Sequence, residues 1–348
     1  MSVEMSRRGF LASAAVTTVG GAALAEAADG PISRDAPAGA KTGPLGKVVG
    51  ELPPGRYDSH VHVMGGEPDP DRLFNSLKAA KLAGACIFSQ PPRKTNRAIP
   101  DPLQPEKAMD DCIRWASASP TIYPFYYIDP AAANAVDLVD MAVEKGFYGF
   151  KVIRNDGYPC DGKTLNVYRR IAQHGKPLTF HTGILWDGGD SSSFFRPANW
   201  EGLVHCPGLR FALCHISWPW CDECIAVYGK FLNAITRNGW RNVPEMFIDT
   251  TPGTPKIYRK DALSKIYTVG YDVFDHIMFG TDCRVTNYNV KWSLDWRKTD
   301  DAIYDGLELD AATRDSAYRT ALQRYLFGGD NSNRRAPTAD GLPRPKIG

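Results

Sequence analysis

Short apolar segments recur along the chain, and each ends in polar, glycine or proline residues. Their length and composition predict eight strands: Tyr57–Val63, Ala85–Ser89, Ile122–Ile128, Phe147–Ile153, Pro177–Thr182, Leu209–Ile216, Glu245–Thr250 and Ile277–Thr281. Stretches with apolar residues at helical spacing lie between most of these strands: Asp71–Ala83, Pro105–Ser117, Asn134–Lys145, Leu165–His174 and Asp261–Val269. Alternating strands and helices predict parallel β/α units, and eight such units predict a closed, TIM-type (β/α)8 barrel.

An open, doubly wound sheet is the alternative α/β architecture for this alternation. It predicts a glycine-rich phosphate loop after the first strand. The first strand carries instead the run Asp58–His62, with the sequence Asp-Ser-His-Val-His, which contains no glycine. We therefore predict a single, distorted barrel domain over residues 55–327, a length that suits one barrel of ~250 residues.

The amino-terminal segment has the character of an export signal. Arg7 and Arg8 precede an alanine-rich, mildly apolar run. This pattern predicts a twin-arginine signal peptide over residues 1–27, cut after Ala25 or Ala27, and therefore a periplasmic or secreted protein. The apolar run is shorter than the ~20 residues that span a bilayer, so we expect no stable membrane anchor.

Two further segments fall outside the barrel pattern. Residues 28–54 are rich in glycine, proline and alanine, which predicts a linker or surface wrap, and residues 328–348 are expected to form an extended C-terminal tail. The formal net charge is +2, which gives no basis for a nucleic-acid surface. A small-molecule substrate is the expected partner, and association into a homo-oligomer stays open.

The chain has eight cysteines. An even number permits disulfides in an oxidising compartment, but a chain that folds before export and buries its own core does not need them. Cys86, Cys214 and Cys283 lie in apolar, strand-like runs, where a small buried side chain is the usual role. Cys221 and Cys224 form a Cys-x-x-Cys pair without a second pair at zinc-ribbon spacing, which favours a structural role over redox chemistry or metal binding.

The first predicted strand carries the most informative motif. Residues two apart in a strand point to the same side, so Asp58, His60 and His62 share one face. Two imidazoles on one face of an apolar strand are costly to bury unless something binds them. A divalent metal does so, because histidine is its commonest protein ligand. A buried, hydrogen-bonded pair without metal is the alternative.

Three other predicted strands end in residues of the same chemical kind. His181 follows Pro177–Phe180, His215 follows an apolar run, and Asp282 follows Phe279-Gly-Thr. Barrel enzymes place their catalytic groups at the carboxyl ends of the strands. A single histidine at such a position is weak evidence of a site, but the three together with the histidine pair predict a metal centre at the barrel mouth.

The run Asp58–His62, followed by His181, His215 and the run Phe279–Asp282, resembles the amidohydrolase superfamily in the kind and order of its motifs. The most similar branch is the amidohydrolase-related (amidohydrolase 2-like) group. That group also contains carboxymuconate-semialdehyde-type decarboxylases and lactone hydrolases. The resemblance covers residues 57–282.

This resemblance implies a divalent metal, zinc before others, at one ion per chain. In the superfamily the matching residues bind the metal, which assigns His60, His62, His181 and Asp282 as ligands. Asp282 would also act as acid and base. His215 would polarise the substrate or help to bind a second metal, which the resemblance leaves open.

Other residues at the predicted barrel mouth each have two possible roles or a role at the rim. Lys151 ends the fourth strand, where some superfamily members use a carboxylated lysine to bridge two metals; a contact with a substrate anion is the alternative. Arg154 follows at the same rim and is a candidate for binding a polar substrate. Asp58 would ligate the metal or orient a ligand. Trp218 and Trp186 would line a flat, aromatic mouth, with core packing as the alternative.

We therefore predict a metal-dependent hydrolase that uses metal-activated water on an amide, ester or lactone of a small, carboxylate-bearing substrate. Non-oxidative decarboxylation, or hydration of an unsaturated acid, is the alternative reaction at the same site. A catalytically inactive periplasmic binding protein is the alternative from another class. The complete set of predicted ligands argues against it.

Overall fold

The computed structural model describes residues 30–92, 103–187, 189–237, 243–332 and 334–335. The predicted signal peptide, residues 1–27, and most of the predicted C-terminal tail lie outside these residues. Within them, strands and helices alternate along the chain, as the apolar pattern predicted.

The strands form one sheet in which all neighbours are parallel, in the order β8-β7-β6-β5-β4-β3-β2-β1-β9. They are β1 (Tyr57–His62), β2 (Gly84–Phe88), β3 (Ile122–Tyr127), β4 (Gly149–Val152), β5 (Pro177–Phe180), β6 (Arg210–Leu213), β7 (Glu245–Asp249), β8 (Ile277–Met278) and β9 (Cys283–Arg284). Sequential parallel strands that each pair with the next are the topology of a TIM barrel.

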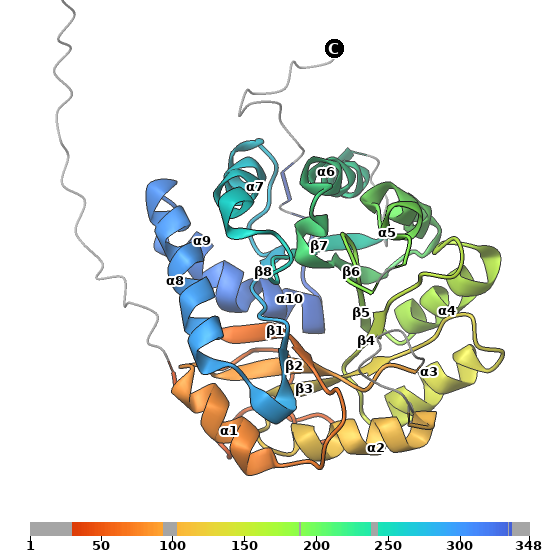
Figure 1. Ribbon diagram of the computed structural model, residues 1–348, viewed down its shortest axis with the longest axis vertical. Helices are drawn as coiled ribbons and strands as arrows, with labels where there is room; N and C mark the ends of the chain where they lie inside the picture. Colours follow the sequence, from red (N-terminus) through yellow and green to blue (C-terminus); the bar gives the residue numbers. More distant parts are fainter. Residues whose placement is uncertain (1–29, 93–102, 188, 238–242, 333, 336–348) are drawn as a thin grey trace, which may run out of the picture.

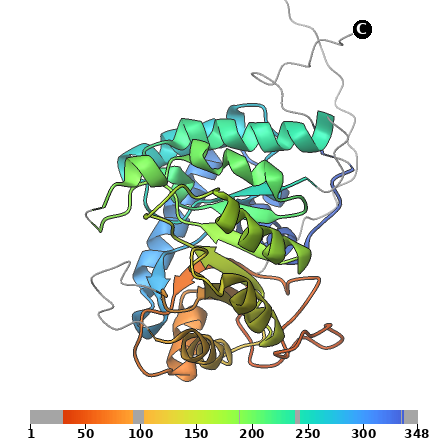
Figure 2. The same ribbon diagram turned by 90° about the vertical axis from the view of Figure 1, so that its right-hand side faces the viewer.

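Helices surround the strands on the outside (Figure 1; Figure 2). They are α1 (Pro70–Ala79), α2 (Pro105–Ala116), α3 (Ala135–Glu144), α4 (Gly162–Gln173), α5 (Ser191–Phe194), α6 (Cys221–Arg237), α7 (Lys256–Thr268), α8 (Val290–Gly306), α9 (Ala311–Asp315) and α10 (Ala321–Phe327). Short turns η1 (Pro197–His205), η2 (Cys214–Ser217), η3 (Val285–Asn287) and η4 (Ser316–Thr320) complete the description. The predicted α/β class and the distorted TIM barrel are confirmed.

The eighth strand of the barrel is split, which differs from the predicted strand Ile277–Thr281. β8 pairs with β7, whereas β9 pairs with β1. Between them, the backbone N–H of Ser59 donates to the carbonyl of Phe279 over 2.9 Å. The strand breaks because Gly280 passes close to β1: a Cβ there would lie 2.7 Å from the Cβ of His60. The two halves close the barrel.

The sixth strand is also shorter than predicted. It ends at Leu213, and the chain then turns through η2 with φ of 60°, 49° and 54° at His215, Ile216 and Ser217. Three consecutive non-glycine residues in this region are strained, so surrounding contacts must hold the turn. The carbonyl of His215 accepts hydrogen bonds from the Trp218 N–H and, at 3.3 Å, from Thr254 Oγ1.

Helix α7 begins at Lys256, five residues before the predicted start at Asp261. The first turn of α7 does not follow the usual apolar periodicity of a helix, because the apolar Ile257 is 82 % exposed whereas the charged Arg259 is fully buried. The guanidinium of Arg259 donates to both carboxylate oxygens of Asp300 on α8, at 2.9 and 2.7 Å. A charged side chain therefore occupies a core position that periodicity assigns to an apolar one.

The amino-terminal end of the barrel is closed by α10. Tyr325 points into the barrel, where its hydroxyl lies 2.8 Å from Thr179 Oγ1 and its ring packs 5.0 Å from Phe247. Leu52, from the segment that was expected to be a linker or wrap, is buried in the same apolar cluster. The floor of the barrel is thus packed, and its open end lies at the carboxyl ends of the strands.

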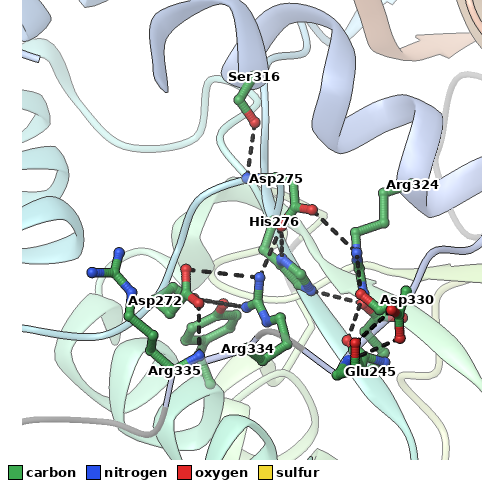
Figure 3. Close-up of polar contacts among 12 residues, drawn as sticks. Glu245, Asp272, Asp275, His276, Ser316, Arg324, Asp330, Arg334 and Arg335 are labelled. Carbon is green, nitrogen blue, oxygen red and sulfur yellow. Dashed lines mark hydrogen bonds and ion pairs between the residues drawn. The ribbon is translucent and has the colours of Figure 1, made fainter. Parts of the chain in front are cut away.

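An ion-pair network fixes the last described residues beneath this floor (Figure 3). Arg324 on α10 donates to Glu245 over 2.5 Å and pairs with Asp275 at 3.2 Å, and His276 lies between the same two carboxylates at 2.8 Å from each. Arg334 pairs with Asp275 at 2.8 Å. These groups lie at the amino-terminal end of the strands, which in TIM barrels is the end that supports stability.

All eight cysteines are free and buried. The pair Cys221 and Cys224 lies in the first turn of α6, and burial raises the pKa of both thiols to about 11 and about 12. They are therefore protonated side chains of the packed interior. Among the described residues, no helix combines the length and the apolar character needed to cross a bilayer.

Candidate active site

A cavity of about 250 Å³ opens at the carboxyl ends of the strands. Six polar residues singled out from the sequence line it, and they come from five different strands or strand ends: His60, His62, Lys151, His181, His215 and Asp282. Tyr127, Trp186, Gly253 and Arg284 are among the other lining residues. The barrel therefore brings together side chains that are spread over more than two hundred residues of sequence.

Three polar atoms form a triangle at one side of the cavity. His62 Nε2 lies 3.1 Å from His60 Nε2 and 3.1 Å from Asp282 Oδ1, and His60 Nε2 lies 3.6 Å from the same oxygen. Ligands at ~2.0–2.1 Å from a tetrahedral zinc ion are about 3.3–3.4 Å from one another. The three separations bracket that value, so this triangle fits a small divalent cation.

His60 is oriented by a residue from the opposite part of the chain. Its Nδ1 lies 2.6 Å from Oδ2 of Asp249, which ends β7, and both side chains are buried. The other carboxylate oxygen of Asp249 accepts hydrogen bonds from the backbone N–H and the hydroxyl of Thr251. Since Asp249 accepts the Nδ1–H proton of His60, the lone pair of Nε2 faces the cavity, as metal binding requires.

Asp58 is held away from the cavity by four donors. Oδ1 accepts from the backbone N–H groups of His60 and Thr281, and Oδ2 accepts from the hydroxyls of Thr281 at 2.5 Å and Tyr288 at 2.8 Å. Burial raises the pKa of Asp58 to about 6 against the opposing effect of these donors. Asp58 therefore ties β1 to the split eighth strand, and of its two predicted roles the geometry is that of an orienting group.

The remaining histidines carry nitrogen atoms that the protein leaves unsatisfied. His181 Nε2, His62 Nδ1 and His215 Nδ1 are buried without a hydrogen-bond partner among the described residues. Burial lowers the pKa of His60 to about 3 and also lowers the pKa of His181 and His215. The rings of His60, His181 and His215 are therefore neutral, which is the form that binds metal, and unsatisfied ring nitrogens beside a carboxylate fit a metal as the missing partner.

Asp282 has the backbone and environment of a reactive group. Its φ is 60°, an uncommon conformation for a residue with a side chain, and 41 % of its side chain is exposed. Desolvation raises the pKa of its carboxyl, but the hydrogen bond with His62 opposes this effect, and the pKa lies below its usual value. Asp282 is therefore an ionised carboxylate that faces the cavity.

Lys151 supplies a positive charge deep in the cavity. It is 1 % exposed, donates to Cys214 Sγ over 3.1 Å and lies 5.0 Å above the ring of Phe88. Burial raises the pKa of the Cys214 thiol, so this acceptor is neutral. Within the described parts of the chain, no carboxylate forms an ion pair with Lys151. A buried ammonium with a neutral partner favours contact with an anion that enters from outside.

Two candidate residues lie apart from the cavity lining. Arg154 donates to Asp156 over 2.8 Å and to Asp161, the N-cap residue of α4, over 3.4 Å. It thus connects the loop after β4 to the next helix. Trp218 packs at the rim, where its ring is stacked 6.4 Å from that of Trp186, and it lines a neighbouring groove.

Sequence reasoning overlooked Asp249, Cys214 as a partner of Lys151, and Arg284. Asp249 could have been identified from the sequence, because it is a carboxylate at the carboxyl end of an apolar strand, like Asp282. Its role depends on which ring it faces, and the periodicity of one strand does not reveal that. Arg284 lies in β9, which exists only because the eighth strand is split.

Comparisons with known proteins agree with this fold. The 5-carboxyvanillate decarboxylase of Novosphingobium aromaticivorans DSM 12444, solved with manganese, is 11 % identical with a TM-score of 0.51 over 85 % of this chain and 99 % of that one. Dihydroorotase from Campylobacter jejuni is 15 % identical with a TM-score of 0.50 over 77 % and 81 %. At such identities the likeness shows a shared fold.

No curated protein matches the sequence. A family model described as "Amidohydrolase" matches residues 57–321, from the first strand with its histidine pair to the start of α10. That span includes His60, His62 and Asp282 and all strands of the barrel. The chain therefore belongs to the amidohydrolase family.

Proposed function

We propose that this protein is a metal-dependent hydrolase that cleaves an amide, ester or lactone bond in a small substrate with a carboxylate group. The observation that carries the proposal is the triangle of His60 Nε2, His62 Nε2 and Asp282 Oδ1, with separations of 3.1 to 3.6 Å at the wall of a cavity. Such an arrangement of two imidazoles and a carboxylate is the ligand chemistry of catalytic zinc sites.

His60, His62, His181 and Asp282 would hold one divalent cation, and zinc is the cation that best suits these ligands. When bound, the cation would lower the pKa of a water molecule from 15.7 toward ~7 and would polarise a carbonyl group of the substrate. His181 belongs to this set because its Nε2 is buried and unsatisfied among the described residues. Asp249 would keep His60 in the tautomer that leaves Nε2 free.

Asp282 and His215 are the residues that we expect to assist the reaction. An ionised Asp282 carboxylate, exposed to the cavity, is placed to accept a proton from water and later to deliver it to the leaving group. His215 lies in the strained turn η2 beside the cavity, with a ring centroid 4.9 Å from that of His181. There it would donate a hydrogen bond to the substrate oxygen that gains negative charge.

Lys151 and Arg284 are the reason why we propose a carboxylate group in the substrate. Both line the cavity, and the ammonium group of Lys151 has a neutral thiol as its acceptor. A carboxylate that entered the cavity would therefore gain an ion pair with a buried cation, in a region where the low local dielectric strengthens such contacts.

The same two cations favour one second candidate, a non-oxidative decarboxylase. A carboxylate held by Lys151 and Arg284 is also the group that such an enzyme removes. Hydrolysis consumes water and releases an alcohol, amine or ring-opened acid, whereas decarboxylation releases carbon dioxide. Product analysis therefore separates the two reactions without any change to the proposed metal ligands.

The test compares wild-type protein with His62→Ala and with His174→Ala. His174 is a surface histidine paired with Asp140, so its replacement is a matched control. Elemental analysis should find about one divalent metal ion per chain in wild-type protein and in His174→Ala, and little in His62→Ala. A panel of lactones, esters, N-acyl amino acids and aryl carboxylates, monitored for hydrolysis and for carbon dioxide, identifies the reaction. Full metal content in His62→Ala would refute the assigned site.

A further inference from the structure

Three aromatic side chains form a continuous ladder from the cavity rim across the molecular surface. The rings of Trp186 and Trp218 are stacked, with centroids 6.4 Å apart and planes inclined by 18°. The ring of Tyr258 follows, 6.1 Å from Trp218 and inclined to it by 30°. Trp186 lines the active-site cavity, whereas Trp218 and Tyr258 line the groove beside it. The ladder therefore begins at the cavity and leads away from it.

Trp186 and Trp218 come from two loops and Tyr258 from the first turn of α7, and hydrogen bonds connect these segments. The N–H of Ile184, two residues before Trp186, donates to the carbonyl of Trp218 over 2.9 Å. The carbonyl of His215 accepts from the N–H of Trp218 at 3.0 Å and from the hydroxyl of Thr254 at 3.3 Å. The ladder is thus built on the turn that carries His215, so its position relative to the site is set by backbone contacts.

The ladder exposes more aromatic surface than folding requires. Trp186 is 79 % exposed and Tyr258 is 52 % exposed. Trp186 therefore contributes little to the core. The exposed rings of Trp186 and Tyr258 favour a planar partner, because aromatic groups prefer stacked or edge-to-face contacts with one another.

The charged side chains near the groove are paired with one another. Lys265 pairs with Asp222 and Asp261, at 3.0 Å from each, and Arg196 pairs with Glu223. Each of these three acidic side chains beside the ladder therefore already has a basic partner. The surface that remains available is apolar and flat, and the free positive charge lies inside the cavity at Lys151.

We propose that the ladder of Trp186, Trp218 and Tyr258 is an outer substrate subsite that binds a planar, unsaturated group. The substrate then has two parts: a carboxylate-bearing part that enters the cavity toward Lys151, and a flat, apolar extension that lies on the ladder. The proposal rests on the proposed function for the direction in which the substrate lies. It adds a substrate class, an extended molecule with an aromatic or conjugated tail.

Binding of three simple carboxylates tests this subsite directly. The probes are benzoate, biphenyl-4-carboxylate and 4-cyclohexylbenzoate, and the last two differ only in whether the outer ring is flat. Dissociation constants are measured by calorimetry with zinc-supplemented protein. Wild-type protein should bind biphenyl-4-carboxylate on the order of tenfold more tightly than benzoate, and more tightly than 4-cyclohexylbenzoate.

Variants of the ladder separate stacking from general hydrophobicity. Trp186→Ala should remove the preference for the biphenyl compound, while Trp186→Phe, which keeps a ring, should retain most of it. Tyr158→Ala is the matched control, because Tyr158 is 53 % exposed and does not line the cavity. An unchanged preference in Trp186→Ala would overturn the proposal, as would wild-type protein that binds the three probes equally or binds none of them.

Two further measurements separate this proposal from the metal-hydrolase assignment and from a dimer interface at the ladder. His62→Ala should keep the ratio between biphenyl-4-carboxylate and benzoate, so a failure of the metal-hydrolase assignment leaves the ladder assignment standing. Light scattering of wild-type protein and Trp186→Ala tests whether a second copy of the chain covers the ladder. A wild-type dimer that becomes a monomer in Trp186→Ala would make the ladder an interface between copies and would contradict the subsite.

Discussion

His60 on β1 and Asp249 on β7 are 189 positions apart in the sequence, and their side chains meet at 2.6 Å in the buried wall of the cavity. The contact determines which nitrogen of His60 carries the proton. With Nδ1–H donated to Asp249, Nε2 presents its lone pair toward His62 and Asp282. A residue outside the predicted ligand set therefore orients His60 for the proposed metal site.

Replacing Asp249 with Asn should weaken metal binding about 10- to 100-fold, the usual effect of losing such an orienting carboxylate. An amide cannot serve both Thr251, which donates twice to one oxygen, and His60, which needs an acceptor at the other. Zinc affinity measured by chelator competition checks this. Asp140→Asn is the control, since Asp140 pairs with His174 on the surface. Equal affinity in wild type and Asp249→Asn would remove this role from Asp249.

Asp282→Asn should lower turnover by about 10²- to 10⁴-fold, the range for a positioned acid or base. Asparagine keeps the shape and one oxygen donor but does not take up a proton near neutral pH. Metal content should fall much less than turnover, because three histidines remain. Elemental analysis and steady-state kinetics on the same preparation check this expectation. Near wild-type turnover would mean that the proton moves through another group.

His215→Asn should reduce turnover and leave the metal content nearly intact if one ion binds per chain. The reason is geometric, because the triangle of close polar atoms contains His60, His62 and Asp282 but not His215. The decisive measurement is the number of metal ions per chain before and after the substitution. A fall from two ions to one would show a binuclear site, and Lys151 would then become the candidate bridge.

Gly280→Ala should destabilise the barrel and disturb His60 together. The added Cβ would lie 2.7 Å from the Cβ of His60 and still closer to Thr251 Oγ1, so the two strands must separate. Overpacking of this kind costs about 1–3 kcal/mol. Urea unfolding measures the loss of stability, and Gly162→Ala is the control because no atom lies within 4 Å of a Cβ at Gly162. Equal midpoints for the two variants would contradict the close approach of these strands.

Lys47 should make stability rise with pH above neutrality. Burial lowers its pKa from the ordinary 10.5 to about 7. Between these values the unfolded chain holds a proton that the folded chain lacks, so raising the pH favours the folded state in that window. Lys47→Met removes the effect. The difference in unfolding free energy between wild type and variant should therefore grow from pH 7 to pH 9 and stay constant from pH 6 to pH 7. A difference that is the same at all three pH values would contradict the lowered pKa.

Local pattern was sufficient for the barrel and for the histidines that line the cavity. Alternation along β1 placed His60 and His62 on one face, and both line the cavity. His181, His215 and Asp282 were recognised as polar residues at the ends of apolar runs. Backbone sterics impose these regularities on any chain, since side chains alternate along a strand and parallel strands present their carboxyl ends at one mouth.

Other features depended on contacts between distant segments. Arg259 occupies a core position because Asp300 is there to receive it, and Arg154 turns toward Asp161 rather than into the cavity. The eighth strand divides because β1 approaches Gly280 closely.

The sequence by itself determined the order of strands and helices, the histidine pair of β1 and the chemistry of the strand ends, because each of these follows from residues close together in the chain. Only the tertiary structure decided that Asp249 faces His60, that Asp58 is occupied by Thr281 and Tyr288, and that Lys151 meets a neutral thiol. A hydrogen bond has a short range and a narrow angle. Its partner is therefore selected when the barrel closes, and no local pattern specifies it.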